Sequence, residues 1–184
     1  MDLSRTPIRA MEPLLVERLR LAFPAKDFQI QRIPSVLTID EFTRVVKLTP
    51  FIGLAWIGMT VDRNSGRQLD AAMRWRLTMI VKASSQLETR FKGDMRGIGL
   101  DAMVDVATAL LQGWTLEKIG ACWVTGAEAV YAEGWGDMGT VVAQIDFEVR
   151  FQAAVAPLKL VTPDDFAGLD VEWLVDGSAE TGAP

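Results

Sequence analysis

The chain has 184 residues, of which 49% are hydrophobic, and it contains six Trp, one Cys and no His. This length and composition predict one globular domain with a single core. A chain without His lacks the commonest general base and the commonest zinc ligand. A net charge of −5 argues against wrapping duplex nucleic acid, which requires an excess of Lys and Arg.

The single cysteine and the length of the apolar runs indicate the cellular compartment of the protein. Cys122 has no partner for an internal disulfide and lies in an apolar run, so we expect a reducing compartment and a buried thiol. No apolar run approaches the roughly 20 residues needed to cross a bilayer. The N-terminus also lacks the charged, apolar and small regions of a signal peptide. We therefore expect an unexported protein without membrane contact.

The first third of the chain predicts two helices and a connector. Thr6 and Pro7 are typical of a helix start, whereas Pro13 predicts either a kink or a start delayed to about residue 11. Apolar residues near helical spacing follow this start, namely Ile8, Met11, Leu14, Leu15, Leu19 and Leu21. A short strand is predicted at Phe28–Ile33. Thr38–Glu41 fits a capping box and predicts a short helix after it.

Three stretches predict long strands. Phe51–Val61 is apolar at nearly every position, which is typical of a strand covered on both faces or lying in a subunit contact. Arg67–Ala83 and Thr140–Gln152 each alternate apolar and polar residues, so each predicts a half-buried antiparallel strand. If the last two are neighbours, Arg74 or Arg76 should lie opposite Asp146 or Glu148.

The region between these strands predicts a loop, a helix and a hairpin. Residues 84–99 contain three Gly and the basic residues Arg90, Lys92 and Arg96, so they predict a long connection. It is either a solvated loop or a surface that grips a partner or lines an opening. Leu100–Trp114 has apolar residues at helical spacing. Ile119–Ala132 predicts a strand, followed by a glycine-rich hairpin tip at 133–139 that exposes Trp135 for contact. A phosphate-binding role for this tip is disfavoured, because the segment joins two strands rather than opening a helix.

Together these elements predict an α+β fold with one domain. Its sheet should be mixed and mainly antiparallel, with helices packed on one face. We expect the domain to span residues 1–157 and a C-terminal extension to span 158–184. In the extension, Thr162–Asp165 predicts a helical turn, and Val171, Trp173 and Val175 predict a short strand or a docked arm. Order should be lost from about residue 177.

Part of the sequence resembles a known family. Residues 91–103 read Phe-Lys-Gly-Asp-Met-Arg-Gly-Ile-Gly-Leu-Asp-Ala-Met, residues 109–114 read Ala-Leu-Leu-Gln-Gly-Trp, and residues 124–130 read Val-Thr-Gly-Ala-Glu-Ala-Val. These segments resemble the tail-terminator and tail-completion proteins of Mu-like prophages and other long-tailed bacteriophages. The resemblance covers most of residues 5–155. The extension beyond Pro157 is longer than is typical of the family, so nothing is carried over to it.

This resemblance implies a tail-terminator-like fold and a structural role. Such proteins form a ring, typically a homohexamer, on the head-proximal end of the tail tube, where the ring ends tube polymerisation and provides the head-joining surface. The implied partners are other copies of the chain, the tail tube protein and a head–neck connector protein, with DNA only passing through the lumen. The implied location is the virion, after assembly in the bacterial host cytoplasm. The resemblance implies no catalytic, cofactor or metal residue.

The physical pattern suggests where contacts between copies would form. A ring requires a head-to-tail contact that closes on itself. The doubly apolar strand, the glycine-rich connection and the hairpin tip are candidate contact segments. They place Trp56, Arg90, Lys92, Arg96 and Trp135 as expected partner or oligomer contacts. We expect the three basic residues to face a pore or a tube-contacting rim, since they are clustered in an acidic chain.

Other functions remain open at this stage. A head–tail connector or neck completion protein of similar fold would carry the same patterns. A small-molecule-binding α+β module would use Trp56, Trp75 and Trp123 to line a pocket. An enzyme would have to rely on Asp, Glu, Lys or Cys122, which is disfavoured because acids such as Asp146 and Glu148 occupy successive outward positions of a strand.

Overall fold

The computed structural model describes residues 7–65, 68–82, 87–95, 97–117, 119–130 and 139–154. Its helices are α1 (Pro7–Arg20), α2 (Ile39–Val46), α3 (Leu87–Lys92) and α4 (Leu100–Leu111). Its strands are β1 (Gln29–Arg32), β2 (Phe51–Ser65), β3 (Gln68–Lys82), β4 (Gly93–Asp94), β5 (Gly97–Ile98), β6 (Thr115–Leu116), β7 (Gly120–Val130) and β8 (Thr140–Ala154). None of the described helices is both long and apolar enough to span a membrane.

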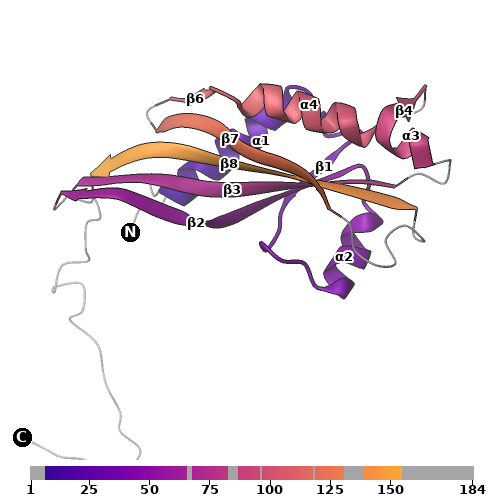
Figure 1. Ribbon diagram of the computed structural model, residues 1–184, viewed down its shortest axis with the longest axis horizontal. Helices are drawn as coiled ribbons and strands as arrows, with labels where there is room; N and C mark the ends of the chain where they lie inside the picture. The colour runs from indigo at the N-terminus through magenta and orange to yellow at the C-terminus, as the bar shows by residue number, and fades with distance from the viewer. Residues whose placement is uncertain are drawn as a thin grey trace, which may run out of the picture.

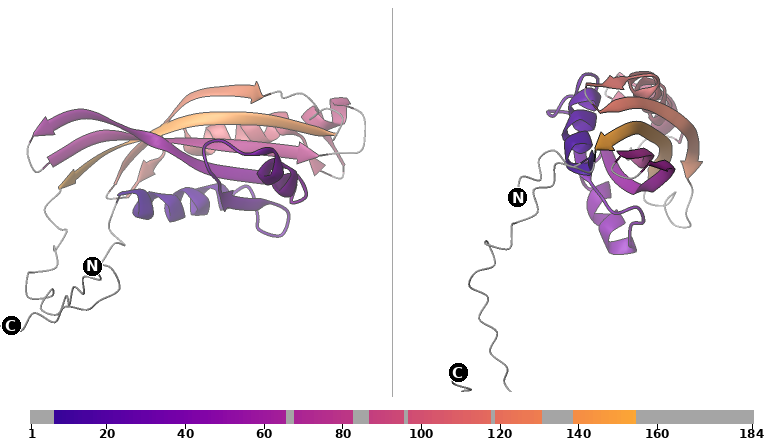
Figure 2. Two further views of the ribbon diagram at one scale, coloured as in Figure 1. Left: turned by 90° about the horizontal axis from the view of Figure 1, so that it is seen from below. Right: turned by 90° about the vertical axis from the view of Figure 1, so that its left-hand side faces the viewer.

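Six of these strands form one sheet, in the order β1-β2-β3-β8-β7-β6. Neighbouring strands are antiparallel except for β1, which runs parallel to β2. The sheet is long, strongly twisted and curled (Figures 1 and 2). The predicted α+β fold with a mixed, mainly antiparallel sheet is therefore confirmed.

The main core lies on the face of the sheet that α1 and α4 cover (Figure 1). The alternating apolar side chains of β3 and β8 point into it, as the two-residue period predicts. Helix α1 buries Met11, Leu15 and Leu19, which are spaced four residues apart and therefore share one side of the helix. Helix α4 buries Leu100, Met103, Ala107 and Leu111 in the same way.

A second, smaller cluster lies on the opposite face, under α2. Phe42, Val45 and Val46 of this helix pack on side chains of β2, β3 and β8. Figure 1 shows α2 on the side of the sheet away from α1 and α4. The prediction of helices on one face thus holds for α1 and α4, whereas α2 covers part of the other face. Phe51, Ile80 and Val142 supply the apolar patch that α2 buries, because each interrupts the polar side of its strand.

Two local predictions need correction. Pro13 lies inside α1, which begins at Pro7, so the helix start is not delayed. Residues 84–99 are also more regular than the predicted long connection: they contain α3 and the small hairpin of β4 and β5. Close approach requires glycine at Gly93 of this hairpin and at Gly99, which follows it. A Cβ on Gly93 would lie 2.6 Å from the Gly99 backbone nitrogen, and one on Gly99 would lie 2.1 Å from the Phe91 carbonyl oxygen.

The predicted capping box of α2 is present. The Glu41 backbone N–H donates to Thr38 Oγ1 at 3.3 Å, and the Thr38 backbone N–H donates to Glu41 Oε2 at 2.9 Å. We expect Thr38→Ala to lower the free energy of unfolding by about 1 kcal/mol, because one helix-end donor loses its acceptor. Denaturant unfolding measures this, with Ser35→Ala as the control that removes an exposed hydroxyl outside the cap. Equal losses for the two variants would contradict the prediction.

Candidate self-association surfaces

One long strand edge of the sheet is open. Strand β1 pairs with β2 only from Phe51 to Leu54, and no other described strand pairs with the remainder of that edge. Residues 55–65 of β2 therefore form a free edge along most of the strand. Free edges can pair with another chain or segment, so proteins usually shorten, charge or cover them.

The same part of β2 exposes apolar side chains. Trp56, Met59 and Val61 are 37%, 40% and 46% exposed, and they pair with Trp75, Met73 and Ala71 of β3. These β3 partners all point to the main core face, so the three β2 side chains share that face. We call Trp56, Met59 and Val61 the β2 strip. Two β-bulges, between Trp56 and Gly58 and between Val61 and Arg63, bend the strand around it.

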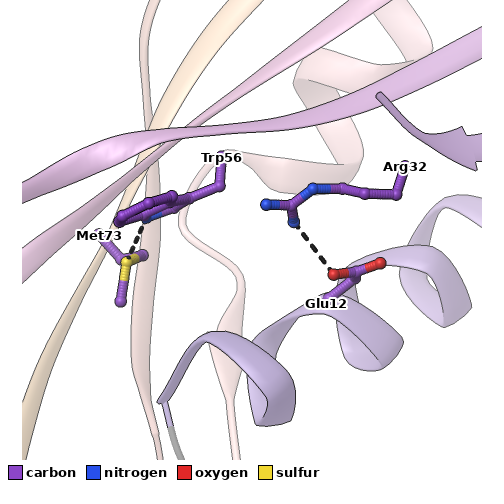
Figure 3. A network of polar contacts seen from close by, with 4 residues as sticks. All are labelled: Glu12, Arg32, Trp56 and Met73. Carbon is purple, nitrogen blue, oxygen red and sulfur yellow. Dashed lines mark hydrogen bonds and ion pairs between the residues drawn. The ribbon is translucent and has the colours of Figure 1, made fainter. Parts of the chain in front are cut away.

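Side-chain contacts fix one end of the β2 strip. The indole Nε1–H of Trp56 donates to Met73 Sδ at 2.8 Å. Figure 3 shows the Arg32 guanidinium extending toward Trp56, with Arg32 Nη1 3.0 Å from Glu12 Oε2 of α1. Arg32 also stacks on the buried Trp75 ring, with its Cζ 4.7 Å from the ring centroid. Trp56 is therefore held in place before any partner binds.

A second apolar surface lies near the other side of the sheet, between α3, α4 and β7. It is a groove of about 290 Å³, which we call the β7 groove. Its apolar lining residues are Phe91, Leu100, Val104, Ala127, Ala129 and Ala143, its acidic lining residues on α4 are Asp101 and Asp105, and Glu128 borders it on β7. Beyond the bulge that follows Val124, the β7 residues 125–129 are all exposed, and no described strand pairs with their outer edge. The β7 groove is thus both apolar and acidic, and it borders a second free strand edge.

The polar face of the sheet has the pairing that the sequence predicted. Arg74 lies opposite Glu148 and Arg76 lies opposite Asp146. The Arg76 guanidinium binds the Asp146 carboxylate through two hydrogen bonds, of 2.6 and 2.7 Å. This bond stabilises the charged form of Arg76 and raises its pKa. Asp146 therefore acts in strand pairing, whereas the Glu148 carboxylate accepts a hydrogen bond from Arg150 Nε of its own strand at 2.9 Å.

The three tryptophans proposed to line a pocket do not converge. Trp75 is fully buried in the main core, and Trp56 is its neighbour on that face. Trp123 pairs with Glu148 and so lies on the opposite, polar face, where it is 45% exposed. A different hollow, of about 490 Å³, lies between the segment 33–39 and the sheet, where Arg76, Thr78 and Gln144 line it. It does not include any of the three tryptophans.

The five expected contact residues divide into three groups. Trp56 is exposed at the free β2 edge. Arg90 and Lys92 lie on α3, beside the β7 groove, where Lys92 Nζ is 2.6 Å from Glu88 Oε1. Arg96 and Trp135 fall outside the described residues. The residue types of Met59 and Val61 did not predict that these side chains are exposed. The nearly continuous apolar run of β2 did suggest a subunit contact.

Within the described part of the chain, no group of three or more His, Cys, Asp or Glu side chains is placed to hold a metal ion.

Cys122 is fully buried, and this burial raises its pKa from 9.0 to about 12. The thiol is therefore neutral at physiological pH and poorly suited to act as a nucleophile, which requires the thiolate.

The buried thiol predicts a loss of stability in alkali. Because the folded-state pKa lies above the unfolded value, the contribution is complete below pH 9 and is lost as the pH rises from 9 toward 12. We expect the free energy of unfolding to fall between pH 8 and pH 10 by about 1 kcal/mol more in the natural chain than in Cys122→Ala. Denaturant titrations at both pH values measure this, and an identical pH dependence in the two proteins would refute it.

Comparison with known proteins gives little further information. No protein-family model matches the chain, and no curated protein matches it. Among solved structures, the chain is similar to a chain in the virion of a native gene transfer agent particle, with 13% sequence identity and a TM-score of 0.47. The match covers 76% of this chain and 92% of that chain. This degree of similarity does not establish a function for the chain.

Proposed function

We propose that the protein is a structural component of a phage tail that assembles into a ring at the head-proximal end of the tail tube. In this role it ends tube polymerisation and provides the surface that joins the head. The observation that carries the proposal is the presence of two different apolar surfaces at opposite edges of one sheet. The sequence resemblance of residues 91–130 to tail-terminator proteins supports the phage assignment.

The two surfaces are suited to meet head to tail. The β2 strip of one copy would enter the β7 groove of the next, so that Trp56, Met59 and Val61 contact Phe91 and the apolar side of α4. Because the surfaces differ, each copy would use both, and the contact would repeat around a closed ring rather than stop at a dimer. The open edges of β2 and β7 would approach each other, which satisfies backbone groups that solvent otherwise binds.

Charges on the polar face favour the same pairing. Arg74 is exposed beside β2, and its Nη2 is 3.5 Å from the position that a Cβ on Gly58 would take. Glu128 is exposed on the β7 edge, opposite Gln144 and therefore on the same face of the sheet as Arg74. In the proposed contact Arg74 of one copy would lie beside Glu128 of the next. Complementary charges of this kind set register and orientation more than they add affinity.

Arg90, Lys92, Arg96 and Trp135 are assigned to the rim of the ring in this proposal. Arg90 and Lys92 lie on α3 at one end of the domain, next to the β7 groove (Figure 1). Such a rim would face the tail tube protein or the head–neck connector, and DNA would only pass through the lumen. The fold needs no cofactor for this role.

Light scattering across a concentration series tests the proposal, combined with negative-stain microscopy. We expect a species of about six times the 20.3 kDa mass of one chain, seen as closed rings. If closure requires the tube, purified tail tubes should recruit the protein to one end only and stop further growth. A protein that stays monomeric and does not bind tube ends would contradict the proposed function. Rings that bind tail-free heads but not tubes would instead assign it to the connector.

A further inference from the structure

The free edge of β2 has the size of a site for one short strand. In a sheet, about half of the backbone N–H and C=O groups of residues 55–65 point away from β3. The described residues supply no strand to pair with them. The two bulges leave Gly58–Val61 as the regular stretch between them. An added strand of about five residues would therefore fit this edge.

The C-terminal part of the sequence contains a segment of that kind. Residues 169–176 read Leu-Asp-Val-Glu-Trp-Leu-Val-Asp. Residues 169, 171, 173 and 175 are apolar, whereas the alternate positions hold Asp170, Glu172, Leu174 and Asp176, so a strand here would have one apolar face and one mainly acidic face. Residues 155–184 hold six acidic residues and one basic residue, a balance of 1 − 6 = −5 that equals the net charge of the whole chain. The remaining 154 residues are thus balanced in charge.

We propose that Val171–Val175 adds to the β2 edge of its own chain as an antiparallel strand. Val171, Trp173 and Val175 then lie beside the side chains of the β2 strip on the same face and shield its outer edge from solvent. Glu172 falls on the other face of the sheet, beside Arg74. Arg74 is exposed at this edge and has no carboxylate partner among the described residues, so it is available to pair with Glu172.

The path of the chain allows this placement. Ala154, the last residue of β8, pairs with Gln68, which in turn pairs with Ser65 at the end of β2. The chain therefore leaves the sheet at the end where the free edge finishes, and Figure 1 shows the ends of β2 and β8 there together. The free edge is about 10 Å away across two strand spacings. The 16 residues between Ala154 and Val171 can span up to about 50 Å, so the segment can turn back and run antiparallel to β2.

This occupant would also regulate assembly, a consequence that rests on the proposed function. The β2 strip is the surface proposed to enter the β7 groove of the next copy. The segment 171–175 would have to leave the β2 strip before the ring closes, so the free chain should form rings only at a higher concentration than a chain without this segment. Its position can be tested in dilute monomer, where no ring contact contributes.

Hydrogen exchange on the full-length chain is the first test. Amides of residues 55–65 should exchange at least about tenfold faster in Val171→Asp/Trp173→Asp/Val175→Asp than in the natural chain, because the added strand is lost. The control Leu158→Asp/Leu160→Asp/Val161→Asp introduces the same charges elsewhere in the extension and should leave these amides unchanged. Equal exchange in the natural chain and the first variant would overturn the proposal, whether or not the protein forms rings.

A disulfide between engineered cysteines distinguishes the chain's own segment from a neighbour's. Under mild oxidation, Met59→Cys with Trp173→Cys should close within one chain at least about tenfold faster than Met59→Cys with Leu160→Cys. The natural Cys122 is fully buried and does not compete. A bond found only between chains, or equal rates for the two pairs, would overturn the assignment.

Charge reversal tests the contact between Arg74 and Glu172. Arg74→Glu should speed hydrogen exchange of residues 55–65, and adding Glu172→Arg should restore the slower exchange of the natural chain. A double variant that exchanges as fast as Arg74→Glu would count against the Arg74–Glu172 contact.

Discussion

Trp75→Ala should lower the free energy of unfolding by about 3–5 kcal/mol, the largest single effect expected in this chain. Trp75 is fully buried at the centre of β3, between β2 and β8, and is the largest of the fully buried side chains. Removing it leaves a cavity in a sheet whose neighbouring strands cannot collapse into the space. It also removes the ring on which Arg32 stacks, so the contact between β1 and the core loses its anchor. Chemical unfolding followed by circular dichroism measures the loss.

The control Trp75→Phe separates volume from polarity. The Trp75 Nε1–H is buried without an acceptor among the described residues. Leaving such a donor unpaired costs roughly 1–3 kcal/mol. Trp75→Phe removes this donor while keeping an aromatic ring, so its loss should be less than half that of Trp75→Ala. Losses of similar size for the two variants would show that the buried N–H costs little or that the site depends on the full indole.

Met59→Asp/Val61→Asp should abolish ring formation while leaving the fold intact. In the proposed contact both side chains enter the apolar β7 groove of the next copy. A carboxylate taken out of water there without a partner costs several kcal/mol, so self-association should weaken by at least about a hundredfold. The groove is itself acidic, which adds repulsion. Light scattering and microscopy report the rings, and binding to tube ends reports function.

The stability of this variant provides the internal check. Both side chains are already exposed by about two-fifths or more, so the free energy of unfolding should change by less than about 1 kcal/mol. The matched control is Val36→Asp/Ile39→Asp, because these residues are 79% and 85% exposed and lie outside both proposed surfaces. The control should form rings normally. Rings in the β2 variant, or their loss in both variants, would refute the proposed contact.

Much of the fold could be predicted from the sequence because it depends on local periodicity. The alternation in Thr140–Gln152 and in the Met73–Val81 stretch correctly assigned the core face of both strands, and the solvent face except where α2 covers it. It also predicted that Arg74 or Arg76 lies opposite Asp146 or Glu148, and both pairs are present. The capping box of α2 could also be predicted, since it depends on a few neighbouring residues, and the burial of Cys122 agreed with its place in an apolar run.

Predictions failed where the outcome depends on distant parts of the chain. Three glycines between residues 84 and 99 suggested a loop, yet two of them, Gly93 and Gly99, permit close backbone approach between the end of α3 and the β4–β5 hairpin. Helix α2 lies on the less apolar face because Phe51, Ile80 and Val142 form an apolar patch there. These residues come from three different strands, so the pattern of any one strand could not predict the patch. The expected tryptophan pocket failed for a similar reason, because Trp75 and Trp123 belong to opposite faces of the sheet.

The sequence by itself determined the helices α1, α2 and α4, the long strands, which faces of β3 and β8 are apolar, and that β2 is apolar over an unusual length. These properties follow from the period of side chains along one segment. Only the tertiary structure decided that β1 pairs with β2 no further than Leu54 and leaves an open edge, and that the β2 strip and the β7 groove lie at opposite sides of the sheet. Whether an apolar side chain is buried depends on which neighbours cover it, and those neighbours come from segments that are far away in sequence.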